Sequence, residues 1–237
     1  MTNFLRTYDG LYAGVIFAFW FGRFPEMSTN RILALNAIFQ RTGMPVCLIH
    51  DSNFSDWEHP DYPFHPALQY LSAVHKSDYL RAYFMHYYGG GYTDIKQPQR
   101  SWAGFFSSLI DSSKWALGYP ELSPTGTAEL PGDFGQEIRN NYQSIIGMCS
   151  YIMRKNTPLT GLYLDSIENI LSRKLETLSK HPAQNAFENL MKNSDGTSEY
   201  PLRWTEIGGE CLHPLVYLYR NSVLYEPNIC PILYGYR

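Results

Sequence analysis

The sequence predicts an α/β fold, and three observations support this. Residues 77–96 read as a helix, a glycine stop and a short strand. Residues 159–178 have the periodicity of a long amphipathic helix, whereas residues 46–49 are a short apolar run typical of a buried strand. Finally, 237 residues suit one α/β domain with room for a proper core, so we expect a single domain over residues 1–237.

The helix predicted after Ser77 has one continuous apolar face, because Leu80, Phe84, Tyr87 and Tyr88 fall at positions i, i+4, i+7 and i+8. The glycines at 89–91 can provide a left-handed cap and a tight reversal, since glycine adopts positive φ without steric cost. A strand is expected directly after them.

Charged side chains flank this reversal. Asp78 and Arg81 are three residues apart and share a second face of the helix, and Asp94 falls where the strand, with Tyr92 and Thr93, runs out. Two rigid elements would therefore bring two acids and a guanidinium to one place. The alternatives are a helix-dipole role for Asp78, a solvated ion pair for Arg81 and a turn-capping role for Asp94.

Residues 77–96 resemble the Ser-Asp-x-x-Arg helix and Gly-Gly-x-Tyr-x-Asp-x-Asp turn of DXD-type glycosyltransferases, in particular the family 32 kind with its mannosyltransferases and capsular polysaccharide transferases. The resemblance implies a GT-A fold. This is a Rossmann-like, mixed and mostly parallel sheet flanked by helices, which binds a sugar nucleotide at the carboxyl ends of its strands.

Weaker similarities extend over most of the chain. Residues 15–22 resemble the family's first strand, which ends in an aromatic side chain that stacks on the nucleotide base, and this implies a base contact for Phe19 and Trp20. Residues 27–39 would be the next helix, with three inward side chains: Ile32, Leu35 and Phe39. Residues 144–153 and 156–159 resemble a later strand and its Asn-x-Pro turn, and residues 203–210 resemble a strand end.

The sequence departs from the family pattern at the second acid, because the Asp-x-Asp motif is here Asp94-Ile95-Lys96. In one account, the Lys96 ammonium replaces Mn²⁺ or Mg²⁺ beside the leaving diphosphate. In another, Lys96 points away and Asp94 holds the metal together with His213 or Glu210. In a third, the chain is a catalytically inactive partner subunit that still binds a sugar nucleotide.

The resemblance implies transfer of a sugar from a nucleoside diphosphate sugar, UDP more than GDP, to a hydroxyl of a glycan acceptor. Asp78 and Asp94 would bind ribose and sugar hydroxyls, and Tyr92 would also belong to the donor site, while Arg81 and Lys96 would stabilise charge on the diphosphate. An inverting enzyme needs a carboxylate base, and the candidates are Glu210, Glu206, Asp133 and Glu137. Retaining chemistry, as in the resembled groups, requires no dedicated base.

Composition and missing motifs exclude several classes of protein. The net charge of −3 gives no basic footprint for nucleic acid, and the sequence lacks the G-x-S-x-G elbow of hydrolases and the G-x-x-x-x-G-K-[ST] loop of nucleotide phosphotransferases. Four widely spaced cysteines, no signal-peptide pattern and an apolar run of residues 11–21 too short to span a bilayer favour a cytoplasmic protein without a transmembrane segment. Peripheral membrane association stays open. Residues 120–135 are expected to form a loop at the acceptor side.

Overall fold

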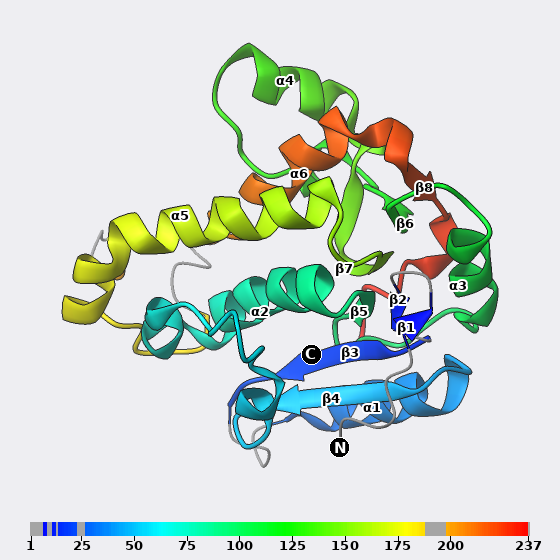
Figure 1. Cartoon of the computed structure of the whole chain (residues 1–237), viewed down its shortest axis with the longest axis horizontal. Helices are drawn as coiled ribbons and strands as arrows, with labels where there is room; N and C mark the ends of the chain where they lie inside the picture. Colours follow the sequence, from blue (N-terminus) through cyan, green and yellow to red (C-terminus); the bar gives the residue numbers. More distant parts are fainter. Residues whose placement is uncertain (1–6, 9–10, 13, 23–26, 188–197, 237) are drawn as a thin grey trace.

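The computed structural model describes residues 7–8, 11–12, 14–22, 27–187 and 198–236. Its helices are α1 (Thr29–Arg41), α2 (Ala73–Tyr87), α3 (Ala103–Ile110), α4 (Gly132–Asn140), α5 (Pro158–Lys180) and α6 (Gly209–Leu218). Its strands are β1 (Thr7–Tyr8), β2 (Leu11–Tyr12), β3 (Ile16–Trp20), β4 (Val46–His50), β5 (Gly90–Thr93), β6 (Ala116–Pro120), β7 (Ile146–Met153) and β8 (Val223–Tyr225). The predicted α/β fold is confirmed (Figure 1).

The main sheet has six strands in the order β4-β3-β5-β7-β6-β8. The pairs β4–β3, β3–β5 and β6–β8 are parallel, whereas β7 runs antiparallel to both of its neighbours, β5 and β6. The sheet is therefore mixed and mostly parallel, as predicted. The strands β1 and β2 form a separate antiparallel pair.

Helices cover both faces of the sheet, and the side chains of β3 alternate between these faces. Phe17 and Phe19 pack in the core cluster that contains α2, α5 and α6. Ile16 packs with α3, and Ala18 packs with α1, on the opposite face. This two-residue alternation gives a three-layer structure, with α1 and α2 on opposite sides of β3 (Figure 1).

Helix α2 begins at Ala73, four residues earlier than predicted, because the Ser72 side chain caps it by accepting a hydrogen bond from the backbone N–H of His75. Its residues from Asp78 to Met85 are all buried, since β3 lies on one side and α5 on the other. The glycine stop is confirmed at Gly89, which has a φ of 67° and donates its N–H to the Phe84 carbonyl. Gly90 and Gly91, however, belong to strand β5.

The predicted inward face of α1 is wrong at two of its three positions. Leu35 is buried, but Ile32 and Phe39 are 45% and 48% exposed. The buried face consists instead of four residues: Ala34, Leu35, Ala37 and Ile38. Small alanines let the helix approach the sheet closely, and the apolar periodicity alone does not distinguish these two faces.

The predictions for residues 144–210 are confirmed in part. The strand predicted over residues 144–153 is present as β7, and the long helix predicted over 159–178 is present as α5. The turn predicted at 156–159 is also present, and Asn156 there has a φ of 55°. Helix α5 starts with a reciprocal capping box between Thr157 and Thr160. The strand end predicted at residues 203–210 is wrong, because this segment is a turn that opens helix α6.

The cysteines Cys47, Cys149, Cys211 and Cys230 are free thiols, and the first two are half-buried. The loop predicted over residues 120–135 is shorter in the structure, because Pro120 ends β6 and helix α4 begins at Gly132; residues 121–131 are irregular apart from one short 3₁₀ turn. In the described parts of the chain, no helix combines the length and apolar character that crossing a membrane requires.

We expect Gly90→Ala to destabilise the protein by about 2–4 kcal/mol. Gly90 has a φ of +98°, and a Cβ at this position would lie 2.7 Å from the Val15 carbonyl oxygen of the neighbouring strand. Urea unfolding of the two proteins measures the difference. Gly104→Ala is the matched control, because Gly104 lies in α3 with open space around it and should be neutral or slightly stabilised. Equal stabilities of the two variants would contradict this account.

Candidate functional site

The strand order places a crevice at the carboxyl ends of β3 and β5. After β3, the chain passes through α1 to β4 on one side, and then returns through α2 to β5 on the other side of β3. Ligands of open α/β sheets bind outside the carboxyl ends of the strands at such a switch point. A pocket of about 530 Å³ lies there.

The pocket gathers most of the predicted site residues from separate elements. It is lined by Phe19 and Trp20 of β3, Asp78 and Arg81 of α2, Tyr92 of β5, and Asp94 and Lys96 just after β5. Met148 and Cys149 come from β7, which is antiparallel to β5 and therefore brings its first residues to the same end. The segment at the start of α6 closes another side with Thr205, Gly208 and Gly209.

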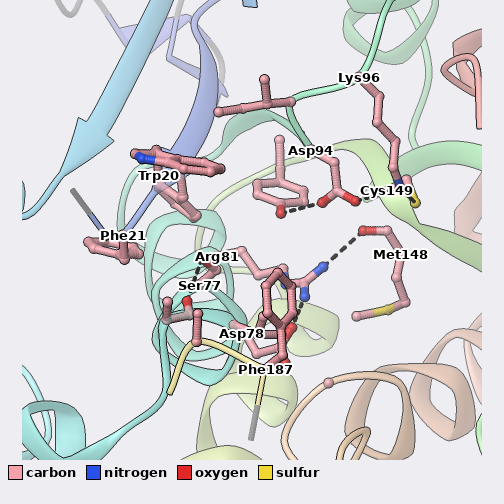
Figure 2. Close-up of a pocket in the computed structure, with 18 of the residues that line it drawn as sticks. Trp20, Phe21, Ser77, Asp78, Arg81, Asp94, Lys96, Met148, Cys149 and Phe187 are labelled. Atoms are coloured by element: carbon pink, nitrogen blue, oxygen red, sulfur yellow. Dashed lines mark hydrogen bonds and ion pairs between the residues drawn. The ribbon is translucent and has the colours of Figure 1, made fainter. Parts of the chain in front are cut away.

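Asp94 lies at the centre of a short hydrogen-bonded chain. One carboxylate oxygen accepts from the Tyr92 hydroxyl at 2.7 Å, and the other accepts from the Lys96 ammonium at 2.8 Å. The ammonium also donates to the Cys149 sulfur at 2.8 Å, as Figure 2 shows. Lys96 therefore points into the pocket, so the account in which it points away from Asp94 does not match the structure.

The charges of Asp94 and Lys96 within this hydrogen-bonded group stabilise each other. Burial by itself raises the pKa of Asp94, but the charges of Lys96 and Arg81 and the hydrogen bonds from Lys96 and Tyr92 outweigh it and hold this pKa below its usual range. Burial by itself lowers the pKa of Lys96, but Asp94 and Cys149 raise it well above its usual range. Both groups are therefore ionised at neutral pH.

Arg81 and Asp78, one helical turn apart in α2, form a buried ion pair with side chains only 9% and 5% exposed. The other guanidinium nitrogen, Nη1, donates to the Met148 carbonyl at 2.9 Å, and the guanidinium carbon lies 5.0 Å from the centre of the Tyr92 ring (Figure 2). Both side chains line the pocket, so this pair can contact a ligand there.

The two predicted base contacts differ in their surroundings. Phe19 is buried and packs against Phe84 and Tyr92, with ring centres 5.3 and 5.5 Å apart. Trp20, the last residue of β3, is half-buried, and its ring lies at the pocket wall beside Phe21 (Figure 2). Trp20 is thus the better placed of the two for stacking.

The residues around Asp94 do not fit a divalent cation. Both of its oxygens already accept hydrogen bonds, and the Lys96 ammonium stands 2.8 Å away, where it would repel a metal ion. Among the described residues, no three His, Cys, Asp or Glu side chains converge into a metal-binding group.

His213 and Glu210 are both in α6, but neither lines the pocket. His213 is 1% exposed, and its Nδ1 accepts a hydrogen bond from the backbone N–H of Ala128 at 3.0 Å. Glu210 forms an ion pair with Arg203 and accepts from the Thr205 hydroxyl at 2.8 Å. The roles predicted for His213 in metal binding and for Glu210 in catalysis stay predictions.

The other candidate bases are also outside the pocket lining. Glu206 binds Lys174 at 2.7 Å, and Glu137 accepts from the Tyr217 hydroxyl at 2.8 Å. Asp133 is exposed in the first turn of α4. Within the described residues, the acids that line the pocket are Asp78 and Asp94.

We expect the stability conferred by His213 to be lost in mild acid. Burial lowers the pKa of His213 to about 4, well below the value of about 6.5 in an unfolded chain. The unfolded state therefore takes up the proton first as the pH falls, and about 2 kcal/mol of stability should be lost between pH 7.5 and 5. Above pH 6.5 the contribution is complete.

Urea unfolding at both pH values, for the native protein and His213→Asn, isolates this contribution. Asparagine can still accept the Ala128 N–H but does not titrate. His75, whose pKa burial also lowers to about 4, is present in both proteins and cancels in the comparison. Identical pH dependence of the two proteins would contradict the assignment.

The pocket residues that sequence reasoning missed include Arg31 and Tyr236. Arg31 is in the first turn of α1 and donates from Nη1 to the Ile95 carbonyl at 2.6 Å. Its guanidinium lies 4.4 Å from the centre of the Tyr236 ring. Arg31 could have been predicted as a site residue, because it lies in the helix that follows the first strand of the sheet. No local sequence pattern indicates that Tyr236 reaches the pocket.

Comparisons with protein-family models and with curated protein sequences give no match. Among solved structures, the chain is similar to one described as "PaToxG Glycosyltransferase", with a TM-score of 0.42 and 15% sequence identity over 89% of this chain and 87% of that chain. Similarity at this level carries no conclusion about function.

Proposed function

We propose that this protein is a GT-A glycosyltransferase that moves a sugar from a nucleoside diphosphate sugar, UDP more than GDP, to a hydroxyl of a glycan or glycoconjugate. The observation that carries the proposal is the composition of one pocket at the switch point of the sheet. An aromatic ring, a buried Asp78–Arg81 pair and an Asp94–Lys96 pair arrive there from three separate elements.

Each group suits one part of such a donor. The Trp20 ring would stack on the base, and the carboxylates of Asp78 and Asp94 would accept hydrogen bonds from ribose and sugar hydroxyls. Arg81 and Lys96 would face the diphosphate. Because their positions are fixed by Asp78, Met148 and Asp94, they need little reorganisation when a ligand binds.

The chemical step breaks the bond between the anomeric carbon and the diphosphate oxygen. Negative charge then develops on the leaving diphosphate, and the Lys96 ammonium is the cation closest to Asp94 that can stabilise it. We therefore propose that the ammonium acts in place of a divalent metal. The sugar is captured by the acceptor hydroxyl, whose proton leaves as the new bond forms.

Retaining chemistry is the better match to the pocket. Its two carboxylates, Asp78 and Asp94, are each engaged by a cation, and the candidate bases Glu206, Glu210, Asp133 and Glu137 do not line it. A mechanism without a dedicated protein base suits this arrangement, since the departing diphosphate can accept the acceptor's proton.

The test is hydrolysis of a panel of UDP- and GDP-sugars, together with UDP binding by calorimetry, in Mn²⁺ and again in EDTA. We expect hydrolysis in EDTA. It should be lost in Asp94→Asn but kept in Asp133→Asn, since Asp133 is an exposed acid. UDP binding without turnover, even with glycan acceptors, would instead indicate an inactive partner subunit. The absence of any nucleotide binding would refute the proposal.

A further inference from the structure

The last described residues, 231–236, form an arm that reaches back to the pocket. The arm is held at its base, where the N–H of Ile232 donates to the Gln97 carbonyl at 2.9 Å and the Gln99 amide donates to the Cys230 carbonyl at 2.8 Å. Beyond this base, Tyr234 is 82% exposed. Gly235 has a φ of +69° with open space around its Cβ position. The arm can therefore change direction at Gly235 without a steric clash.

The arm ends with Tyr236 placed between two cations of the pocket. The Arg31 guanidinium lies 4.4 Å and the Lys96 ammonium 4.8 Å from the centre of the Tyr236 ring. Both distances are within the range of a cation–π interaction. One neutral ring thus occupies the space that Arg31 and Lys96 share.

Both cations are fixed independently of the ring. Arg31 is anchored by its bond to the Ile95 carbonyl, and Lys96 by its bonds to Asp94 and Cys149. Within the described residues, no ion pair joins Arg31 to a carboxylate. Arg31 uses one guanidinium N–H on Ile95, and Lys96 uses two ammonium N–H groups on Asp94 and Cys149, so each cation keeps at least one donor for an anion.

We propose that Arg31 and Lys96 form an anion site for a diphosphate group and that Tyr236 closes this site until the anion displaces it. A diphosphate can bridge a guanidinium and an ammonium with charge-assisted hydrogen bonds, which are stronger than contacts to a partly exposed ring. The identification of the anion as part of a nucleoside diphosphate rests on the proposed function, whereas the site itself does not. Rotation at Gly235 would carry the ring away.

Calorimetric titration with inorganic pyrophosphate in EDTA tests the site directly. Tyr236→Ala should bind pyrophosphate about tenfold more tightly than the native protein, because no ring has to be displaced. Tyr236→Phe keeps the ring and should behave as the native protein does. Tyr234→Ala, a change in the same arm at an exposed side chain, is the matched control and should have no effect.

Arg31→Ala should weaken pyrophosphate binding by about tenfold or more, since it removes one of the two cations. Arg31→Gln, which removes the charge but keeps a long polar side chain, serves if a thermal melt shows that the alanine variant does not fold. Unchanged or weaker binding by Tyr236→Ala would overturn the gate, and unchanged binding by both Arg31 variants would overturn the anion site.

Titration with UDP, uridine and a UDP-sugar separates this inference from the proposed function. If pyrophosphate binding follows the expected pattern while no sugar nucleotide binds or turns over, the gated anion site stands and the glycosyltransferase proposal fails. If donors turn over but Tyr236→Ala leaves pyrophosphate and UDP affinity unchanged, the function stands and the gate fails.

Discussion

Replacing Lys96 with alanine should lower donor turnover by about 10²- to 10³-fold, the usual effect of removing one preorganised electrostatic group from an active site. The ammonium is 2.8 Å from Asp94, and its charge is secured by that carboxylate and by Cys149. Its loss removes the stabilisation of the leaving diphosphate. Addition of Mn²⁺ should not restore activity, because alanine supplies no metal ligand. The measurement is kcat for donor hydrolysis in EDTA and in Mn²⁺.

Two further variants at position 96 sharpen this prediction. Lys96→Arg keeps a cation and should retain part of the activity. Lys96→Asp places a second acid two residues after Asp94, so it should be inactive in EDTA and regain turnover with Mn²⁺. A Lys96→Ala variant that is as active as the native protein in EDTA would show that the ammonium does not replace a metal.

Arg81→Met should destabilise the protein by about 3–5 kcal/mol, because it leaves the buried carboxylate of Asp78 without its counter-charge. The Asp78 side chain is only 5% exposed, and the change also removes the bond to the Met148 carbonyl. Methionine is a good helix former, so α2 itself is not weakened. Urea unfolding at neutral pH measures the loss, and a cost below about 1 kcal/mol would contradict a buried, coupled pair.

The double variant Asp78→Asn with Arg81→Met completes a mutant cycle. Removing both charges should recover much of the stability, since a buried ion pair is often no more stabilising than neutral side chains of similar size. If the double variant is stable but no longer binds UDP, Asp78 and Arg81 serve the ligand rather than the fold. If it remains as unstable as Arg81→Met, the charges are not coupled.

The sequence predicted best where a signal is local. The helix, glycine stop and strand around Asp78, Arg81 and Asp94 lie within 20 residues, so their geometry follows from backbone rules, and the pocket contains all three side chains. Helix α5 was predicted from its local periodicity, whereas strand β7 was predicted from the family resemblance. In α1, by contrast, Ile32 and Phe39 gave a plausible apolar face, but the real one consists of two alanines with Leu35 and Ile38.

Long-range features could not be read from the sequence. Tyr236 reaches Lys96 because the chain returns after β8, and no local pattern indicates that return. His213 and Glu210 are both in α6, and the rotation of α6 about its axis decides which side chains face the pocket. That rotation is set by packing, which buries His213 beside Ala128 and places Glu210 in an ion pair with Arg203.

The pairing of β6 with β8 has a consequence for biosynthesis. Ala116 pairs with Val223, so β6 is complete about 107 residues before its outer neighbour leaves the ribosome. At about 5–20 residues per second, the edge of β6 would stay open for roughly 5–20 s, and an open edge can pair with another nascent chain. Chaperone assistance during translation should therefore raise the yield of native protein more than the same chaperone added to the completed chain.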